Sequence, residues 1–106
     1  MSMVSPESRK SEVSMTNNAL RTNLADNVII ALQALKKGDM AIVENQKIFE
    51  VMEDIQAGHK IALESIAAGE KVYRYGEPIV EATRTINRGE WVHVHNTRPV
   101  PSDMTV

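Results

Sequence analysis

The chain is 106 residues long, 42% hydrophobic and 25% charged, with 12 basic and 14 acidic residues and a net charge of -2. These values predict one globular domain with a modest core, compatible with a homo-oligomer or a partner interface. The near-neutral charge and only four aromatic residues argue against a nucleic-acid partner. The absence of cysteine excludes disulfides, thiolate metal ligands and a cysteine nucleophile, and it fits a cytoplasmic location.

The two ends of the chain differ from its middle. Residues 1–24 hold five serines before position 15, scattered charges and no apolar run, which predicts a flexible tail. No stretch resembles a secretory signal or a membrane span, so we expect neither export nor a membrane partner. Residues 99–106 contain two prolines and are predicted to be a C-terminal exit segment. The folded domain is therefore predicted to cover residues 25–98.

Four short units of the same kind recur along the middle of the chain. Each has an apolar residue, two mostly polar residues, a glycine and a polar residue, at residues 35–39, 55–59, 66–70 and 86–90. The glycine occupies the position at which a tight turn needs a positive φ. An apolar or alternating run follows each of the last three units, which predicts a small β protein built on repeated turns.

The expected strands follow one another in chain order. Residues 27–35 fit either a buried strand or a short helix capped by Asp26, and we favour a strand that runs into a turn. Residues 40–43 and 47–51 flank a hairpin bend, and further strands are expected at residues 60–66, 71–75, 79–86 and 91–95. This spacing predicts an all-β fold, a compact barrel or clip.

Alternation in the last of these strands separates its valines from its histidines. Val92 and Val94 are predicted to point into the core, so that Trp91, His93 and His95 share the opposite face. Two imidazoles at this spacing can bind one metal, or hold a carboxylate and move a proton near neutral pH. They can equally be solvated or interface histidines. Asn96 and Arg98 follow directly and carry groups that recognise hydroxyls and carboxylates.

A second polar group begins at the turn before residue 60. Ile61 and Leu63 are predicted to face the core, and Lys60 to share the opposite face with Ala62 and Glu64. Lys60 is then either an ordinary charge on an edge strand or a hook for an anion.

Arg74 and Tyr75 lie at a further tight turn that Gly76 and Pro78 define. Their guanidinium and phenol groups suit recognition of an acid. The alternative is structural: Tyr75 packs as a lid and Glu77 pairs with Arg74.

These residues together resemble the N-terminal SAF domain of the altronate and galactarate dehydratase family. The resemblance runs in order from about Asp26 to Arg98, and it is carried by Asp26-Asn27-Val28, His59-Lys60-Ile61-Ala62-Leu63, Ile66-Ala67-Ala68-Gly69-Glu70, Tyr75-Gly76-Glu77-Pro78-Ile79, Ala82-Thr83-Arg84 and Gly89-Glu90-Trp91-Val92-His93-Val94-His95-Asn96-Thr97-Arg98. It implies a β-clip fold and membership in the sugar-acid hydro-lyases, or in the related sulfolactate sulfo-lyases, whose small subunit is a free-standing domain of this kind.

The resemblance also implies a division of labour. The large domain of such enzymes is expected to hold iron or manganese, with no cofactor or metal ligand in this chain. We therefore expect a small subunit or domain of a carbohydrate-metabolism lyase that is inactive without a large catalytic partner. Its site residues would be His93 and His95 as catalytic groups, with substrate-binding roles for His59, Lys60, Arg74, Tyr75, Asn96 and Arg98.

A different class of function remains open at this point. SAF domains also resemble antifreeze proteins and pilus or flagellar assembly proteins, in which the clip is a rigid binding surface. The alternative is thus a non-catalytic module that binds carbohydrate or protein.

Overall fold

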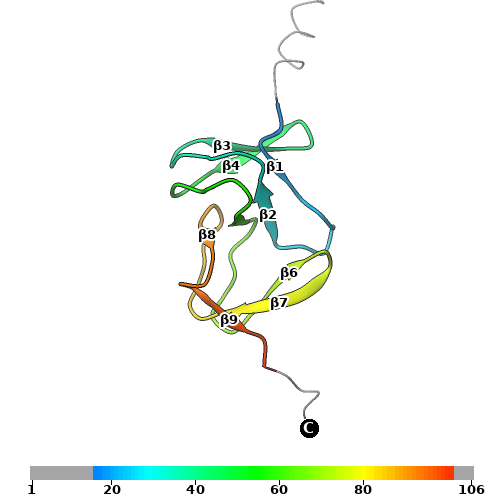
Figure 1. Ribbon diagram of the computed structural model, residues 1–106, viewed down its shortest axis with the longest axis vertical. Helices are drawn as coiled ribbons and strands as arrows, with labels where there is room; N and C mark the ends of the chain where they lie inside the picture. The colour runs from blue at the N-terminus through cyan, green and yellow to red at the C-terminus, as the bar shows by residue number, and fades with distance from the viewer. Residues whose placement is uncertain (1–15, 102–106) are drawn as a thin grey trace, which may run out of the picture.

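Short strands and turns make up residues 16–101, which are the residues that the computed structural model describes (Figure 1). No helix occurs among them, which confirms the all-β prediction. The strands are β1 (Ala19–Leu20), β2 (Val28–Ala31), β3 (Met40–Val43), β4 (Gln46–Glu50), β5 (Lys60–Ala62), β6 (Lys71–Arg74), β7 (Glu77–Ala82), β8 (Trp91–Val92) and β9 (Thr97–Pro99).

All strand pairs are antiparallel, and they form three small sheets. The central sheet has the order β1-β2-β5-β8, the β3–β4 hairpin stands alone, and β6, β7 and β9 form the third sheet. Figure 1 shows β3 and β4 at one end of the molecule, β6, β7 and β9 at the other, and β2 and β8 between them. The pairing of Ile29 with Ile61 and of Ile61 with Trp91 sets the register of the central sheet.

Both faces of the central sheet are buried, because two apolar clusters pack against it. Ile29 and Ile61 belong to the cluster that includes Phe49, and Val28 and Ala62 belong to the other. Neighbouring residues of one strand thus enter different clusters, which explains why β2 is apolar without interruption. The prediction that Ala62 shares a polar face was wrong, since the second cluster covers it completely.

The four glycine turns form as predicted. Gly38, Gly58, Gly69 and Gly89 all have positive φ, between 86° and 95°. At Gly89 the backbone also lies close to its surroundings, because a Cβ there would stand 2.7 Å from the carbonyl oxygen of Glu50. This glycine therefore satisfies both a conformational and a packing requirement.

The turns belong to a duplicated unit with an offset of 31 residues. Leu35 pairs with Ile55 in an isolated β-bridge, and Ile66 pairs with Ile86 in the same way. The hydrogen bonds repeat as well: Gly38 N–H donates to Val51 O, and its counterpart Gly69 N–H donates to Ala82 O. Residues 31–58 and 62–89 thus share one backbone plan, each with a two-stranded hairpin between its two turns.

The segment before β2 is tied to both hairpins. Asn18 bonds to β3 through its side chain, donating Nδ2 to Met40 O and accepting the Ile42 N–H at Oδ1. Further along, the buried Asp26 accepts the N–H groups of Tyr75 and Gly76. Residues 1–15 of the predicted tail lie outside the described residues, and strand pairing begins at β1, ahead of the boundary predicted at residue 25.

Candidate functional site

Three of the predicted site residues gather around the single tryptophan of the chain. His59 ends the turn before β5, Trp91 lies on β8, and the β5–β8 pairing brings them together. The imidazole of His93 stacks on the Trp91 indole, with ring centroids 4.9 Å apart and planes 10° apart, and lies 5.1 Å from the His59 ring. His95 packs against the indole from a tilted position, also at 4.9 Å. We call His59, Trp91, His93 and His95 the imidazole cluster.

His59 is held by a hydrogen bond to the indole. Trp91 Nε1–H donates to His59 Nδ1 over 3.0 Å. In the other three turns the equivalent residues are acidic, and each accepts a backbone N–H of its own turn: Asp39 that of Lys36, Glu70 that of Ala67 and Glu90 that of Asn87. The turn at residues 55–59 therefore has a histidine where its relatives within the chain have a carboxylate that closes the turn.

The predicted strand at residues 91–95 is shorter in the structure, because β8 ends at Val92. The following residues form a turn, and Val94 is 77% exposed, so the prediction that it enters the core was wrong. The reason lies in side chains that take the place of strand hydrogen bonds. Asn96 Oδ1 accepts the N–H of His93 at 2.9 Å, and Asn96 Nδ2 donates to Trp91 O at 2.8 Å.

Asn96 is accordingly buried, and both ends of its amide are engaged inside the chain. The Thr97 hydroxyl completes the turn by donating to His93 O at 2.8 Å. In this arrangement Asn96 shapes the loop that carries His93 and His95. Its proposed contact with a substrate stays a prediction.

Positive charge lies near the imidazole cluster, because Lys60 acts on His93 and Arg74 acts on Lys60. Partial burial lowers the pKa of His93 from its ordinary value of 6.5, and the charges of His59, Lys60 and His95 lower it further. Lys60 is half-buried, and burial first and the charge of Arg74 second lower its pKa from 10.5. A negatively charged group placed here would relieve both effects.

Arg74 and Tyr75 stand together at the β6–β7 turn. The Arg74 guanidinium lies over the Tyr75 ring, 4.8 Å from its centroid, and Nη2 donates to the phenol oxygen at 3.3 Å. Tyr75 is 61% exposed and has a φ of 58°. The alternative pairing of Arg74 with Glu77 does not occur, because the one ion pair within residues 16–101 lies elsewhere.

That ion pair joins Arg98 to Glu81. Arg98 Nε lies 2.6 Å from Glu81 Oε2, across the β7–β9 pair of the third sheet. Glu81 is buried, so the guanidinium compensates a carboxylate that would otherwise be unpaired. Arg98 therefore has a structural partner, and its role toward a substrate remains a prediction.

Sequence reasoning missed three residues that build the site. Trp91 was assigned no role, although it is the only tryptophan and stands next to the histidine pair. Glu53 Oε2 accepts the Trp91 N–H at 2.9 Å from a distant loop. Asp26 fixes the Tyr75–Gly76 turn from 49 and 50 positions away. No local sequence pattern predicts the roles of Glu53 and Asp26, because each contact joins parts of the chain that are far apart in sequence.

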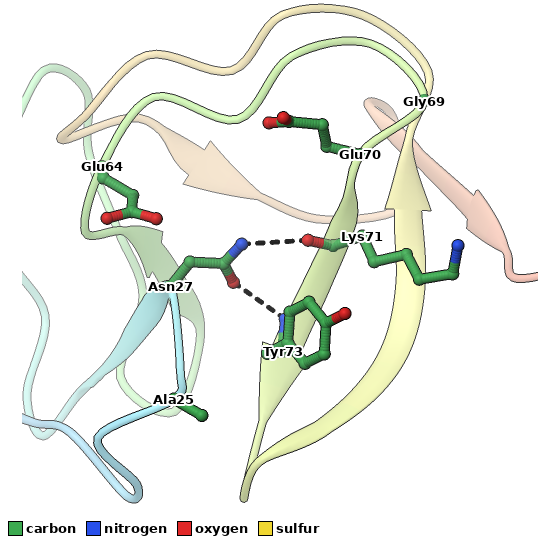
Figure 2. A pocket seen from close by; sticks show the side chains of 7 residues that line it. All are labelled: Ala25, Asn27, Glu64, Gly69, Glu70, Lys71 and Tyr73. Atoms are coloured by element: carbon green, nitrogen blue, oxygen red, sulfur yellow. Dashed lines mark hydrogen bonds between the residues drawn. The ribbon is translucent and has the colours of Figure 1, made fainter.

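A separate hollow of about 440 Å³ opens between the segment before β2 and strand β6. In Figure 2, Asn27 bridges the two walls, donating to Lys71 O at 2.9 Å and accepting the Tyr73 N–H at 2.8 Å. Glu64 and Glu70 line the hollow, but none of the predicted site residues does. Asn27 thus links the two walls, and the hollow lies at a structural junction between them.

Within residues 16–101 no group of three or more histidine and acidic side chains is arranged to hold a metal ion. The imidazole cluster therefore does not supply three metal-ligating side chains in a suitable arrangement. Over the same residues, no helix is long and apolar enough to cross a membrane.

The strand order and the turn pattern define a small all-β clip domain that carries the imidazole cluster beside Lys60. The family model for the altronate/galactarate dehydratase SAF domain matches residues 17–99. The chain belongs to this family.

Relatives place the family among lyases. Altronate dehydratases of Bacillus subtilis (strain 168) and Escherichia coli (strain K12) are each 41% identical over 85 residues, or 80% of this chain. The alpha subunit of (2R)-sulfolactate sulfo-lyase from Chromohalobacter salexigens is 42% identical over 50 residues, which are 47% of this chain and 53% of that subunit. The chain spans only 17% of the length of the two altronate dehydratases.

Proposed function

We propose that the chain is the small, substrate-facing part of a carbon-oxygen or carbon-sulfur lyase that acts on a sugar acid such as altronate or galactarate. In this proposal it supplies anion-binding groups and closes an active site whose larger part belongs to a partner. The observation that carries the proposal is the imidazole cluster beside the ammonium group of Lys60, on a domain of this family.

Elimination of water from a hydroxy acid sets clear chemical demands. A proton next to the carboxylate must be removed, negative charge must be stabilised, and the departing hydroxyl must be protonated. Lys60 and Arg74 can anchor a carboxylate through charge. His93, whose pKa is lowered from its ordinary value, can accept a proton and become the cation that such an anion favours.

His93 and His95 are our candidates for the proton-transfer groups. Both histidines lie on a short loop whose backbone the side chains of Asn96 and Thr97 hold in place through hydrogen bonds. Their rings therefore project from a fixed backbone. As the family resemblance implies, we place the expected iron or manganese in the partner and assign this chain no step that uses it.

The test is turnover of the assembled enzyme with His93→Ala and His95→Ala. Loss of a general acid or base typically lowers the rate by about 10² to 10⁴, whereas each substitution should lower stability by no more than about 1.5 kcal/mol, the scale of one aromatic contact. Val94→Ala is the matched control, because Val94 lies between the two histidines and is exposed.

Thermal melts, metal content and kcat/KM are measured side by side. Unchanged turnover in both histidine variants would show that the imidazoles are surface residues, and it would favour the non-catalytic binding module. Loss of metal together with activity would instead make the histidines ligands.

A further inference from the structure

The hydrogen bond between Trp91 and His59 fixes which nitrogen of His59 carries its proton. A neutral imidazole has one N–H donor and one bare nitrogen that accepts. Because Nδ1 accepts the indole N–H at 3.0 Å, Nδ1 is the bare nitrogen and Nε2 carries the hydrogen. His59 can therefore donate a hydrogen bond from Nε2 while it is neutral.

Trp91 is well placed to impose this state, because its own position is fixed on several sides. Glu53 accepts its backbone N–H, and Asn96 donates to its carbonyl oxygen. The His93 ring is stacked on the indole, and Trp91 also packs against the apolar cluster that contains Ile61. The indole N–H thus points at His59 from a rigid support.

His59 itself is not needed to close its turn. The three equivalent positions hold carboxylates that accept a backbone N–H of the same turn, and His59 makes no such bond among the described residues. The backbone hydrogen bond of the turn forms without the imidazole, because the backbone N–H of His59 donates to Gln56 O at 3.1 Å, as in the other three units. A turn requirement therefore does not explain the histidine.

We propose that Trp91 is a positioning residue that holds His59 as a neutral donor, through Nε2–H, to an oxygen of a carboxylate or hydroxyl of the ligand. This inference rests on the proposed function and refines it. His59 then recognises the acid, and His93 and His95 on the neighbouring loop remain free to exchange protons. The cluster is thus divided into one donor with a fixed tautomer and two groups for proton transfer.

The first test uses the full 106-residue chain alone and needs no partner. In ¹⁵N NMR spectra at about pH 8.5, where imidazoles are neutral, His59 should show a bare Nδ1 and a protonated Nε2. Trp91→Phe keeps a ring for stacking but removes the N–H donor, so His59 should become a mixture of both tautomers. A wild-type His59 protonated at Nδ1 would overturn the inference, as would a tautomer that does not respond to Trp91→Phe.

The second test separates this inference from the proposed function. In the assembled enzyme, Trp91→Phe should lower kcat/KM on the order of tenfold, the scale of one hydrogen bond. Tyr73→Phe is the control, because it removes an aromatic donor outside the imidazole cluster and should leave kcat/KM unchanged. Unchanged kcat/KM in Trp91→Phe beside a large loss in His93→Ala would overturn the role of Trp91 and leave the proposed function standing. Unchanged turnover in both would count against the proposed function itself.

Discussion

Asp26 shows how one buried carboxylate can hold two distant segments together. It is 2% exposed and accepts hydrogen bonds from the Thr22 hydroxyl and from the backbone N–H groups of Tyr75 and Gly76. Burial alone would raise the pKa of its carboxyl, but these hydrogen bonds and the charge of Arg21 outweigh it and lower the pKa below its ordinary 3.8. The ionised carboxylate is thus part of the folded structure.

A lowered carboxyl pKa adds stability above the unfolded-state pKa, and this stability is lost as the pH falls through the folded-state value. We therefore expect Asp26→Asn to lower the free energy of unfolding at pH 7 by about 1.5 to 3 kcal/mol, since an amide cannot accept both N–H groups equally well. The difference from wild type should shrink as the pH falls below the ordinary carboxyl pKa of 3.8 and through the lower folded-state value.

Urea denaturation at pH 7 and at low pH measures this directly. Asp54→Asn is the control, because Asp54 is exposed and accepts a single bond, from the Lys37 N–H. A destabilisation by Asp26→Asn that does not change with pH would contradict the role of the charge.

At this scale the sequence located the histidines, Lys60 and Arg74, but it could not predict their setting. Alternation correctly buried Val92 and wrongly buried Val94, because the side chains of Asn96 and Thr97 bond to the backbone and end the strand. Such bonds compete with a strand without altering its hydrophobic pattern.

The turns were the most predictable elements. Each repeats the same local chemistry: an apolar residue that pairs in a bridge, a glycine with positive φ and, in three of the four, a carboxylate that accepts a bond within the turn. These are short-range features, so a single sequence contains the information. The pairing of one turn with another is long-range, and only the structure shows it.

The glycines are not equivalent, although their φ values are alike. A Cβ on Gly38 would meet nothing within 4 Å, whereas one on Gly89 would lie 2.7 Å from Glu50 O and 2.9 Å from Met52 Cγ. Gly38→Ala should therefore lower the free energy of unfolding only through the unfavourable positive φ, by about 1 to 2 kcal/mol. Gly89→Ala should lower it by that amount and, because of the steric clash, by more, about 3 kcal/mol or more in total.

The comparison needs only thermal or urea unfolding of the two variants with the wild type. Gly69→Ala serves as a second open-space control, because a Cβ there would also meet nothing within 4 Å. Equal destabilisation by all three substitutions would mean that the backbone near Glu50 moves aside.

Over the whole molecule, duplication of one plan produces a domain whose two halves are not interchangeable. The turn at 55–59 has its counterpart at 86–90, yet His59 corresponds to Glu90, and Lys60 corresponds to Trp91. The imidazole cluster forms where the end of the first unit meets the end of the second, through the β5–β8 pair. The repeat supplies the scaffold, and the departures from the repeat supply the chemistry.

The size of the domain sets the last prediction. This chain covers only 17% of the length of each of the two altronate dehydratases. Imidazoles and cationic anchors can bind and reorient an acid, but stabilising an enediolate and expelling a hydroxyl require further groups. We therefore expect the purified 106-residue chain to show no turnover of altronate, galactarate or sulfolactate.

Addition of a large dehydratase-like chain, such as one encoded in a neighbouring reading frame, should restore turnover, and His93→Ala in the small chain should remove most of it again. The measurement is substrate loss and product formation for the small chain, the large chain and their mixture, with Val94→Ala as the control in the mixture. Robust turnover by the small chain alone would refute the division of labour. If the large chain is fully active by itself, the small chain acts as a binding module. A domain that completes the active site would be needed for turnover, whereas a binding module would not.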